Sequence, residues 1–578
     1  SFTYTGGLST FGDNDTWTPL ERHETSYTVT SNLTRLVGAH ELRAGFDFIR
    51  YQLNHFQPEL GAGPRGDFAF SGNITGTPGY TSNTWNQYAA FLLGQTSVVS
   101  KSIQFEEMTG RENQYGLFVS DRWNASQKLT LNLGLRWEYY PVMTRVGRGI
   151  ERLDFATFDV LLGGVGDVPK DLGIKVSKTL FAPRLGAAYR IDEKTVFRAG
   201  YGITYDPIPW SRPLRGFYPL TIGFSQSASG VTGSDFASFP LAAGIPPVPL
   251  PDISSGRVPL PRNVTTRTPD PNDVERGRTQ QWNVTLERQL PAEISVSVGY
   301  VGTRTDGGYA DQDLNFADSG GDINRNLFAQ AGTAQILDWA ARTKSRYKAL
   351  QVAINRPFKG GLLLKGAYTW SQAKNETDDD GWATLLWSQP SQLSRNFALA
   401  GYDRTHNFQM GFLYEIAYGK SGTGPVAAIL KDWQLNGVFG AFSGTPFRID
   451  GDNTALAQRA GQQTIDLIAP LRRVGKPGPN EVYFDPASFA QPGNKFGNTG
   501  RNQFRGPSVW NLDLGLFRGI PIGHYRVELR AQAQNVLNHS RWGNPITTFT
   551  DPNFMRIRTN DPNINSPRRV QLGLRFQF

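Results

Sequence analysis

The sequence predicts an all-β protein, a transmembrane antiparallel β-barrel of about 18 strands with short turns at one end and long loops at the other. Three observations predict it. Long segments alternate between apolar and polar residues, short and long connections between these segments also alternate, and the chain ends inside such a segment at Phe578. Alternation with a period of two is the pattern of a strand with one apolar and one polar face.

The alternating segments are long. The clearest are LTLNLGLRWEYY (129–140), TVFRAGYGITY (195–205) and HYRVELRAQAQ (524–534). Strands of globular proteins usually have about five or six residues. A tilted strand that crosses a membrane needs about 9–11 residues. The lengths therefore favour strands that span a bilayer.

The connections fall into two classes. Tight ones lie at 192–194, 291–293, 357–361 and 521–523, and very long ones at 141–180, 207–277, 304–346, 373–404, 444–507 and 539–567. Outer-membrane barrels have short periplasmic turns and long outside loops. Counting back from a C-terminal strand that runs inward gives an even number of strands, as single-chain bacterial barrels require. The predicted strands are 568–578, 524–538, 508–520, 432–443, 405–417, 362–372, 347–357, 294–303, 278–290, 195–206, 181–191, 128–140, 112–123, 96–106, 86–93, 40–55, 22–35 and 1–6, with 216–226 as an additional hairpin arm.

Composition excludes several classes of protein. The 578 residues contain no cysteine, so there is no disulfide framework and no thiolate metal site. The net charge of +9 comes from scattered residues, without the basic tract of a nucleic-acid-binding arm, and no nucleic-acid partner is expected. No run of about 18 apolar residues encodes a transmembrane helix. The chain begins at Ser1 without a signal peptide, and we expect an N-terminally incomplete barrel domain over 1–578.

Charged residues on the polar face of the predicted strands are the first candidate site. They would line the lumen, where charges must be paired or hydrated. A barrel of this size has room for water or a plug, so we expect either a ligand path or a plug-docking surface. Ion pairing between neighbouring strands is the purely structural alternative. The residues are Arg43, Asp47, Arg136, Glu138, Arg198, Arg526, Glu528, Arg530 and Arg575.

Aromatic residues form the second candidate set. Some rings fall near strand ends, where an interfacial girdle is favoured over the filling of a soluble β core. These rings are Trp123, Tyr139, Tyr140, Tyr205, Tyr300, Trp370, Tyr414, Trp433 and Trp510. The long loops carry further rings that could stack on a sugar or siderophore. The predicted ligand contacts are Trp210, Phe217, Tyr218 and Phe224.

No catalytic or metal constellation stands out. The six histidines show no H-x-x-x-H spacing, and no nucleophile motif occurs, so we expect neither an enzyme nor a cofactor. The acidic run NETDDDG (375–381) matches no calcium loop, and we expect a solvated loop tip there rather than a cation site.

An ordered series of segments carries a family resemblance. From about Arg111 onward, the chain resembles the barrel portion of Oar-like TonB-dependent outer-membrane receptors. Each segment alone is only modestly specific, whereas their order is specific. The segments include RTQQWNVTLERQLP (278–291), VSVGYVGTRTDG (296–307), YKALQVAINRPFKGGLLLKGAYTWSQAKNETDD (347–379), YDRTHNFQMGFLYEIAYGKSG (402–422), KDWQLNGVFGAFSGTPF (431–447), GNTGRNQFRGPSVWNLDLGLFR (497–518) and VELRAQAQNVLNHSRWGNP (527–545).

The resemblance implies a barrel of about 22 strands around a plug domain. It also implies energy from the inner-membrane TonB complex, an outer-membrane location, contact with lipid and lipopolysaccharide, and insertion by the barrel assembly machinery. This chain departs from the plan, because we find in it no plug, no TonB box and no carboxypeptidase-regulatory-like domain. We therefore expect the C-terminal barrel portion of a receptor, which reaches the TonB complex through an N-terminal region outside this sequence.

Several functions fit these expectations. The first is a receptor whose long loops bind an unknown solute that a plug-gated lumen imports. A passive porin without a plug, a protein-secretion or structural role in the outer membrane, and a soluble all-β binding protein are the alternatives.

The last nine residues, VQLGLRFQF (570–578), fit the closing strand of a barrel. A terminal phenylalanine resembles the C-terminal signature by which outer-membrane barrels are recognised for insertion. Phe578 is therefore predicted to be an assembly signal.

Overall fold

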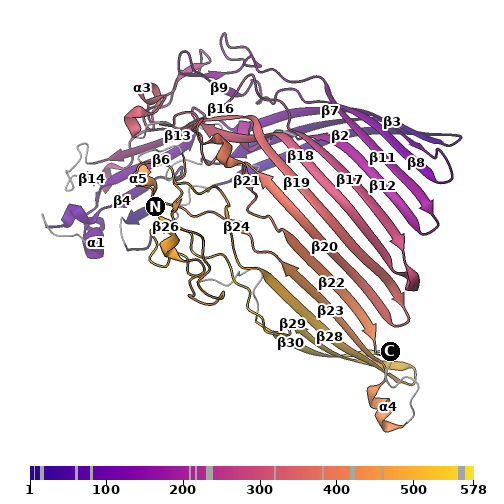
Figure 1. Cartoon of the computed structure of the whole chain (residues 1–578). Helices are drawn as coiled ribbons and strands as arrows, with labels where there is room; N and C mark the ends of the chain where they lie inside the picture. The colour runs from indigo at the N-terminus through magenta and orange to yellow at the C-terminus, as the bar shows by residue number, and fades with distance from the viewer. Residues whose placement is uncertain are drawn as a thin grey trace.

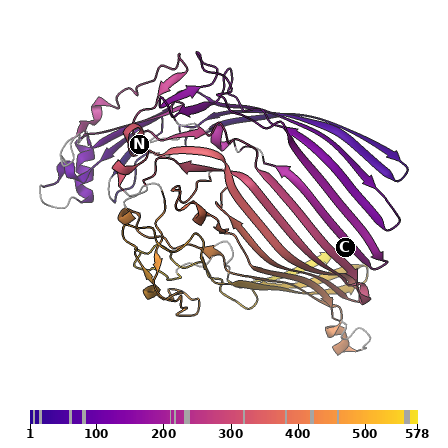
Figure 2. The same cartoon turned by 45° about the horizontal axis from the view of Figure 1, so that its top comes forward.

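A large curved antiparallel sheet dominates the computed structural model (Figures 1 and 2). The structure describes residues 1–4, 7–12, 18–58, 63–77, 83–206, 208, 210–214, 218–228, 238–317, 321–379, 383–416, 424–456, 461–557 and 567–578. The sheet is the barrel wall, and its strands are β2 (Glu21–Val37), β3 (His40–Phe56), β7 (Met108–Trp123), β8 (Leu129–Tyr139), β11 (Leu180–Asp192), β12 (Thr195–Tyr205), β17 (Arg278–Gln289), β18 (Ser295–Asp313), β19 (Ile336–Lys359), β20 (Leu362–Asn375), β22 (His406–Glu415), β23 (Trp433–Phe442), β28 (Val509–Ile522), β29 (Tyr525–Gln534) and β30 (Arg569–Gln577).

Each wall strand pairs with the next one along the chain, from β2 to β30. Among the described residues, no register joins β2 to β30. These two outermost strands are exposed along almost their whole length, because each has a wall neighbour on one side only. The all-β antiparallel fold class predicted from the sequence is confirmed.

The two ends of the wall differ, as the connections predict. At the end that we call the short-turn end, Val37 lies directly opposite His40, so Gly38 and Ala39 alone reverse the chain. Gly38 has a φ of +58°, a left-handed conformation that favours glycine. A second tight turn follows Asp192, whose carboxylate accepts a hydrogen bond of 2.8 Å from the Lys194 amide. The opposite end is the long-loop end.

Three of the eighteen predicted wall strands are wrong, and the described wall has fifteen. Residues 1–6 and 96–106 contribute β1 (Phe2–Tyr4) and β6 (Val98–Gln104) to a separate four-stranded sheet, with β4 (Asp67–Phe70) and β13 (Thr221–Ser227). Residues 86–93 fall largely in a helix, α1 (Thr84–Leu92), because Asn83 and Asn86 form a capping box at its start. The predicted hairpin arm at 216–226 is a single strand of that sheet, β13, paired with β6.

The remaining elements lie in the connections. Helix α4 follows β22 at the short-turn end, whereas the others lie at the long-loop end (Figure 1). In the described residues, no helix has the length and apolar character needed to cross a membrane. The strands are β5 (Gln95–Thr96), β9 (Glu151–Asp154), β10 (Asp159–Leu162), β14 (Phe239–Pro240), β15 (Arg257–Pro259), β16 (Thr266–Pro269), β21 (Ala398–Leu399), β24 (Pro446–Phe447), β25 (Asp466–Leu467), β26 (Phe489–Ala490) and β27 (Phe504–Arg505), and the helices are α2 (Ser211–Leu214), α3 (Phe328–Ala331), α4 (Pro425–Leu430) and α5 (Asn453–Leu456).

The long loops have hydrophobic cores of their own. One core gathers ten buried residues between Phe447 and Ile557, and another joins Met143 and Ile150 to Val274 and Trp339. Because such cores exclude water, the loops at this end are folded against one another. We call this folded region the long-loop assembly.

A buried ion cluster also holds the long-loop assembly together. Glu151 accepts hydrogen bonds from Arg145 and Arg148, with Nη–Oε distances of 2.7 and 2.5 Å. The Arg145 and Glu151 side chains are only 2% and 6% exposed. Burial opposes ionisation of Glu151, but the two guanidinium groups outweigh burial and hold the pKa of Glu151 below its ordinary value.

Acid should loosen the long-loop assembly around Glu151. Because the pKa of Glu151 is lower in the folded than in the unfolded protein, its ion pairs contribute fully above the unfolded value of about 4.3. That contribution is lost as the pH falls through the folded-state pKa. The protection factors of residues 145–162 against hydrogen–deuterium exchange, each taken relative to the intrinsic exchange rate at that pH, should therefore fall between pH 7 and pH 3.

The Glu151→Gln variant supplies the comparison. It leaves the buried Arg145 without a carboxylate and Arg148 with Glu106 alone, so protection of 145–162 should already be low at pH 7. Glu193→Gln, in an exposed turn, should behave like the unmodified protein. Unchanged protection of 145–162 in the unmodified protein down to pH 3 would contradict the proposed contribution of Glu151.

Candidate functional site: the polar face of the wall

The strand registers place the polar residues of the wall on one face. Gly45, Phe118 and Arg136 lie directly opposite one another on β3, β7 and β8, and Asp47 and Glu138 flank Gly116 one row away. Successive residues of a strand point to opposite faces, so these rows belong to the same side of the sheet. We call it the polar face.

The opposite, apolar face carries large exposed side chains. Leu117, Leu133, Leu185 and Leu286 are all more than 40% exposed. The aromatic residues predicted as a girdle lie on the same face at Trp123, Tyr139, Tyr205, Tyr300, Trp370, Tyr414, Trp433 and Trp510. Tyr140 differs, since it is buried with the Arg276 guanidinium 4.4 Å from its ring centre. A broad exposed apolar surface of this kind requires a non-aqueous neighbour.

The nine charged residues predicted to share a face do so in the registers. They fall into two groups on the polar face. Arg43, Asp47, Arg136, Glu138 and Arg198 lie on β3, β8 and β12, whereas Arg526, Glu528, Arg530 and Arg575 lie on β29 and β30. Their function as a ligand path or plug-docking surface stays a prediction.

Many of these charges form ion pairs with nearby residues, as expected if their role is purely structural. Arg136 Nη1 lies 2.5 Å from Asp47 Oδ2, and its Nε donates to Glu138 at 2.7 Å. Gly116 makes room for this guanidinium, because a Cβ there would lie 2.1 Å from Arg136 Nη2. In contrast to Arg136, Arg198 pairs with Glu287 in a half-exposed setting.

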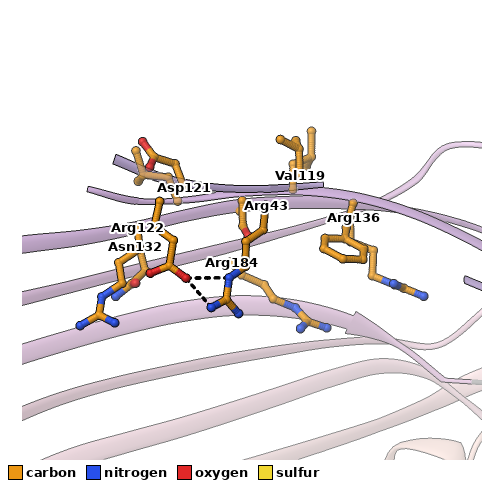
Figure 3. Close-up of a pocket in the computed structure, with 13 residues that line it drawn as sticks. Arg43, Val119, Asp121, Arg122, Asn132, Arg136 and Arg184 are labelled. Carbon is orange, nitrogen blue, oxygen red and sulfur yellow. Dashed lines mark hydrogen bonds and ion pairs between the residues drawn. The ribbon is translucent and has the colours of Figure 1, made fainter. Parts of the chain in front are cut away.

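A hollow of about 510 Å³ lies along strands β3, β7, β8 and β11. Figure 3 shows Arg43, Arg122, Arg136 and Arg184 pointing to the side of the sheet opposite Val119 and Asp121. Arg122 and Arg184 are not among the predicted lumen-facing residues, although the alternation within 112–123 and 181–191 already places them on the polar face.

The predicted ligand-contact aromatics are dispersed. Trp210 packs within the long-loop assembly, where its Nε1 donates to Glu112 at 2.5 Å, and Tyr218 packs against another core. Phe224 is half-buried on β13, and Phe217 lies outside the described residues. No local pattern in the sequence signals this contact, because Trp210 and Glu112 lie 98 positions apart.

In the acidic run at 375–381, Asp378 and Asp379 are exposed, as expected for a loop tip, but the run is also hydrogen-bonded to other loops. Asp378 accepts hydrogen bonds from the Gly401 amide at 2.8 Å and from Arg501 at 3.0 Å, and Glu376 accepts from the Lys344 amide. Asp380 lies outside the described residues. In the described part of the chain, no three or more His, Asp or Glu residues are arranged to hold a metal ion.

The family model described as "Outer membrane beta barrel domain" matches residues 1–571. The chain belongs to this outer-membrane β-barrel family. The apolar face of this barrel domain therefore faces lipid, and its place is the outer membrane of Gram-negative bacteria. No curated protein matches the sequence.

Several solved structures resemble the barrel at low identity. The outer membrane transporter YddB from Escherichia coli is 10% identical with a TM-score of 0.47, over 96% of this chain and 54% of that one. The siderophore receptor PirA from Acinetobacter baumannii is 10% identical with a TM-score of 0.45, over 96% and 55%. The ferric-catecholate import receptor Fiu from Escherichia coli K12 is 12% identical with a TM-score of 0.42, over 96% and 54%. This chain spans about half the length of these proteins.

A charge on the apolar face should destabilise the protein in a bilayer. Leu286→Arg places a guanidinium among lipid tails, at an expected cost of about 2–4 kcal/mol at mid-depth. Thr285→Arg places the same charge at the adjacent position, on the polar face. It should cost less than about 1 kcal/mol, because the guanidinium stays hydrated there. Urea unfolding midpoints of the protein in phospholipid vesicles measure both, and equal losses would contradict the assignment of faces.

Ion pairs on the polar face should differ in strength according to their burial. Arg136→Ala leaves Asp47 and Glu138, 24% and 12% exposed, without their shared cation, which should cost about 1–3 kcal/mol. Arg198→Ala should cost at most about 1 kcal/mol, since its pair with Glu287 is half-exposed. The urea midpoints of the two variants make the comparison, and an Arg198→Ala loss as large as that of Arg136→Ala would contradict this order.

Proposed function

We propose that this chain is the barrel of a TonB-dependent receptor of the Oar-like type. The long-loop assembly binds a solute at the cell surface, and the solute passes along the polar face to the short-turn end, which faces the periplasm. The observation that carries this proposal is the polar face itself, which runs along the wall below a folded long-loop assembly and bears charges on both flanks.

Barrel closure fits the same proposal. In a bilayer the backbone groups at the outer edges of β2 and β30 must be hydrogen-bonded. The resemblance implies about 22 strands, so about seven more than the fifteen described strands would complete the circle. A plug within that circle would gate the lumen and contact the TonB complex.

The geometry of Phe578 fits the predicted assembly signal of such a barrel. It follows β30, is 99% exposed and stacks on Phe576 with a ring-centre distance of 6.3 Å. An exposed terminal ring at the short-turn end is open to the barrel assembly machinery before lipid covers it.

Binding to TonB and channel conductance test the function without knowledge of the solute. Protein extracted from outer membranes should be retained by the immobilised periplasmic domain of TonB. It should also give no steady conductance in a planar bilayer in potassium chloride, because a plug closes the lumen. Stepwise open channels together with an absence of TonB binding would favour the passive porin and overturn the proposal.

A further inference from the structure

We propose that the hollow between Arg122 and Arg184 binds an anionic group, a carboxylate or phosphate, of the solute that crosses the barrel. This site deepens the proposed function. That the bound solute crosses the barrel rests on the proposed function. The binding chemistry itself depends only on the residues of the polar face.

The arginines surround a floor of small residues. Arg43, Ser120, Gly134 and Arg184 lie in one row across β3, β7, β8 and β11. Arg122 lies two residues from Ser120 along β7, towards the short-turn end. Because Ser120 and Gly134 have small or no side chains, the middle of this row is open, and this opening is the hollow of about 510 Å³.

The arginines are close enough to share one ligand. Arg122 and Arg184 are separated by two strand spacings and two residues along the strand, so their Cα atoms lie about 12 Å apart. Arg136 stands on the strand between them, but its guanidinium lies over Gly116, where Asp47 and Glu138 hold it. Arg122 and Arg184 therefore border the same floor. Asn132 lies opposite Arg122 on β8 as a further hydrogen-bond donor, and Glu41, the acceptor of Arg43, lies opposite Arg122 on β3.

Two of these charges are not neutralised. Arg43 donates to Glu41 and Arg136 is shared by Asp47 and Glu138, whereas Arg122 and Arg184 make no ion pair within the described residues. Both side chains belong to exposed residues and remain available to a ligand. A planar guanidinium with five donors binds carboxylates and phosphates through paired hydrogen bonds.

The charge is not spread evenly over the polar face of the wall. On β18 and β19 between 295 and 305 and between 345 and 355, the polar-face residues are all uncharged: Ser295, Ser297, Gly299, Val301, Thr303, Thr305, Ser345, Tyr347, Ala349, Gln351, Ala353 and Asn355. A solvated lumen does not require arginines, since hydroxyl and amide groups line the wall elsewhere. The unpaired arginines thus give one side of the lumen a preference for anions.

Inorganic pyrophosphate is a suitable probe because it presents two phosphoryl groups and enters a hollow of this size. Isothermal titration calorimetry at about 10 mM ionic strength keeps electrostatic screening small. The protein is extracted from outer membranes, and each variant is first checked for heat-modifiable gel mobility. The double variant R122Q/R184Q should weaken binding at least tenfold, as expected for the loss of charge-assisted hydrogen bonds of about 1.5–3 kcal/mol.

Two further variants separate a built site from diffuse attraction. Arg190→Gln removes an equal charge from β11 on the same face but outside the hollow, and should change the dissociation constant less than twofold. Gly134→Leu keeps every charge and fills the floor, and should weaken binding at least tenfold. A Cβ at Gly134 meets its nearest neighbours at 3.5 Å, an ordinary contact, so the strand can accept the substitution.

The outcomes are distinct from those of the function test. Equal weakening by Arg190→Gln and Arg184→Gln, or unchanged binding in R122Q/R184Q, overturns the anion site. TonB binding without pyrophosphate binding overturns the anion site alone. Pyrophosphate binding with the predicted variant pattern but without TonB binding supports the site and overturns the transport mechanism.

Discussion

Backbone hydrogen bonding in lipid is the constraint on which the structure depends. A hydrocarbon phase offers no partner to an N–H or C=O group, so a strand that crosses it must be paired with its neighbours along its length. The wall meets this demand by pairing each strand with the next one along the chain. Neighbouring strands of this kind need only tight turns at one end, which leaves the other end free to hold long insertions.

The two faces of the wall follow from the same geometry. Since side chains alternate, one set meets lipid and the other meets the lumen, and a single strand such as β8 carries both leucines and the Arg136–Glu138 pair. The polar face therefore combines two uses of charge. Arg136 is held between carboxylates and stabilises the wall, whereas Arg122 and Arg184 keep their hydrogen-bonding groups available.

The sequence predicts most of the wall because alternation is a local signal. Segments such as 129–140 and 195–205 show it without interruption, and they are strands β8 and β12. Residues 86–93 were assigned wrongly because a capping box at Asn83 and Asn86 stabilises a helix there. The position of Trp210 was not predictable either, since its contact with Glu112 joins residues 98 positions apart. Arg122 and Arg184 lay within predicted strands, but only the register across β7, β8 and β11 brings them to one hollow.

The buried cluster around Glu151 affects how antibodies and bacteriophages recognise the long-loop assembly at the cell surface. Arg145, Arg148 and Glu151 fix the loop backbone from inside the long-loop assembly, and hydrophobic cores hold neighbouring loops against it. An antibody or bacteriophage that approaches the cell thus meets a discontinuous epitope assembled from distant parts of the chain. Synthetic peptides copied from single loops would present the same residues without the shape that such a binder recognises.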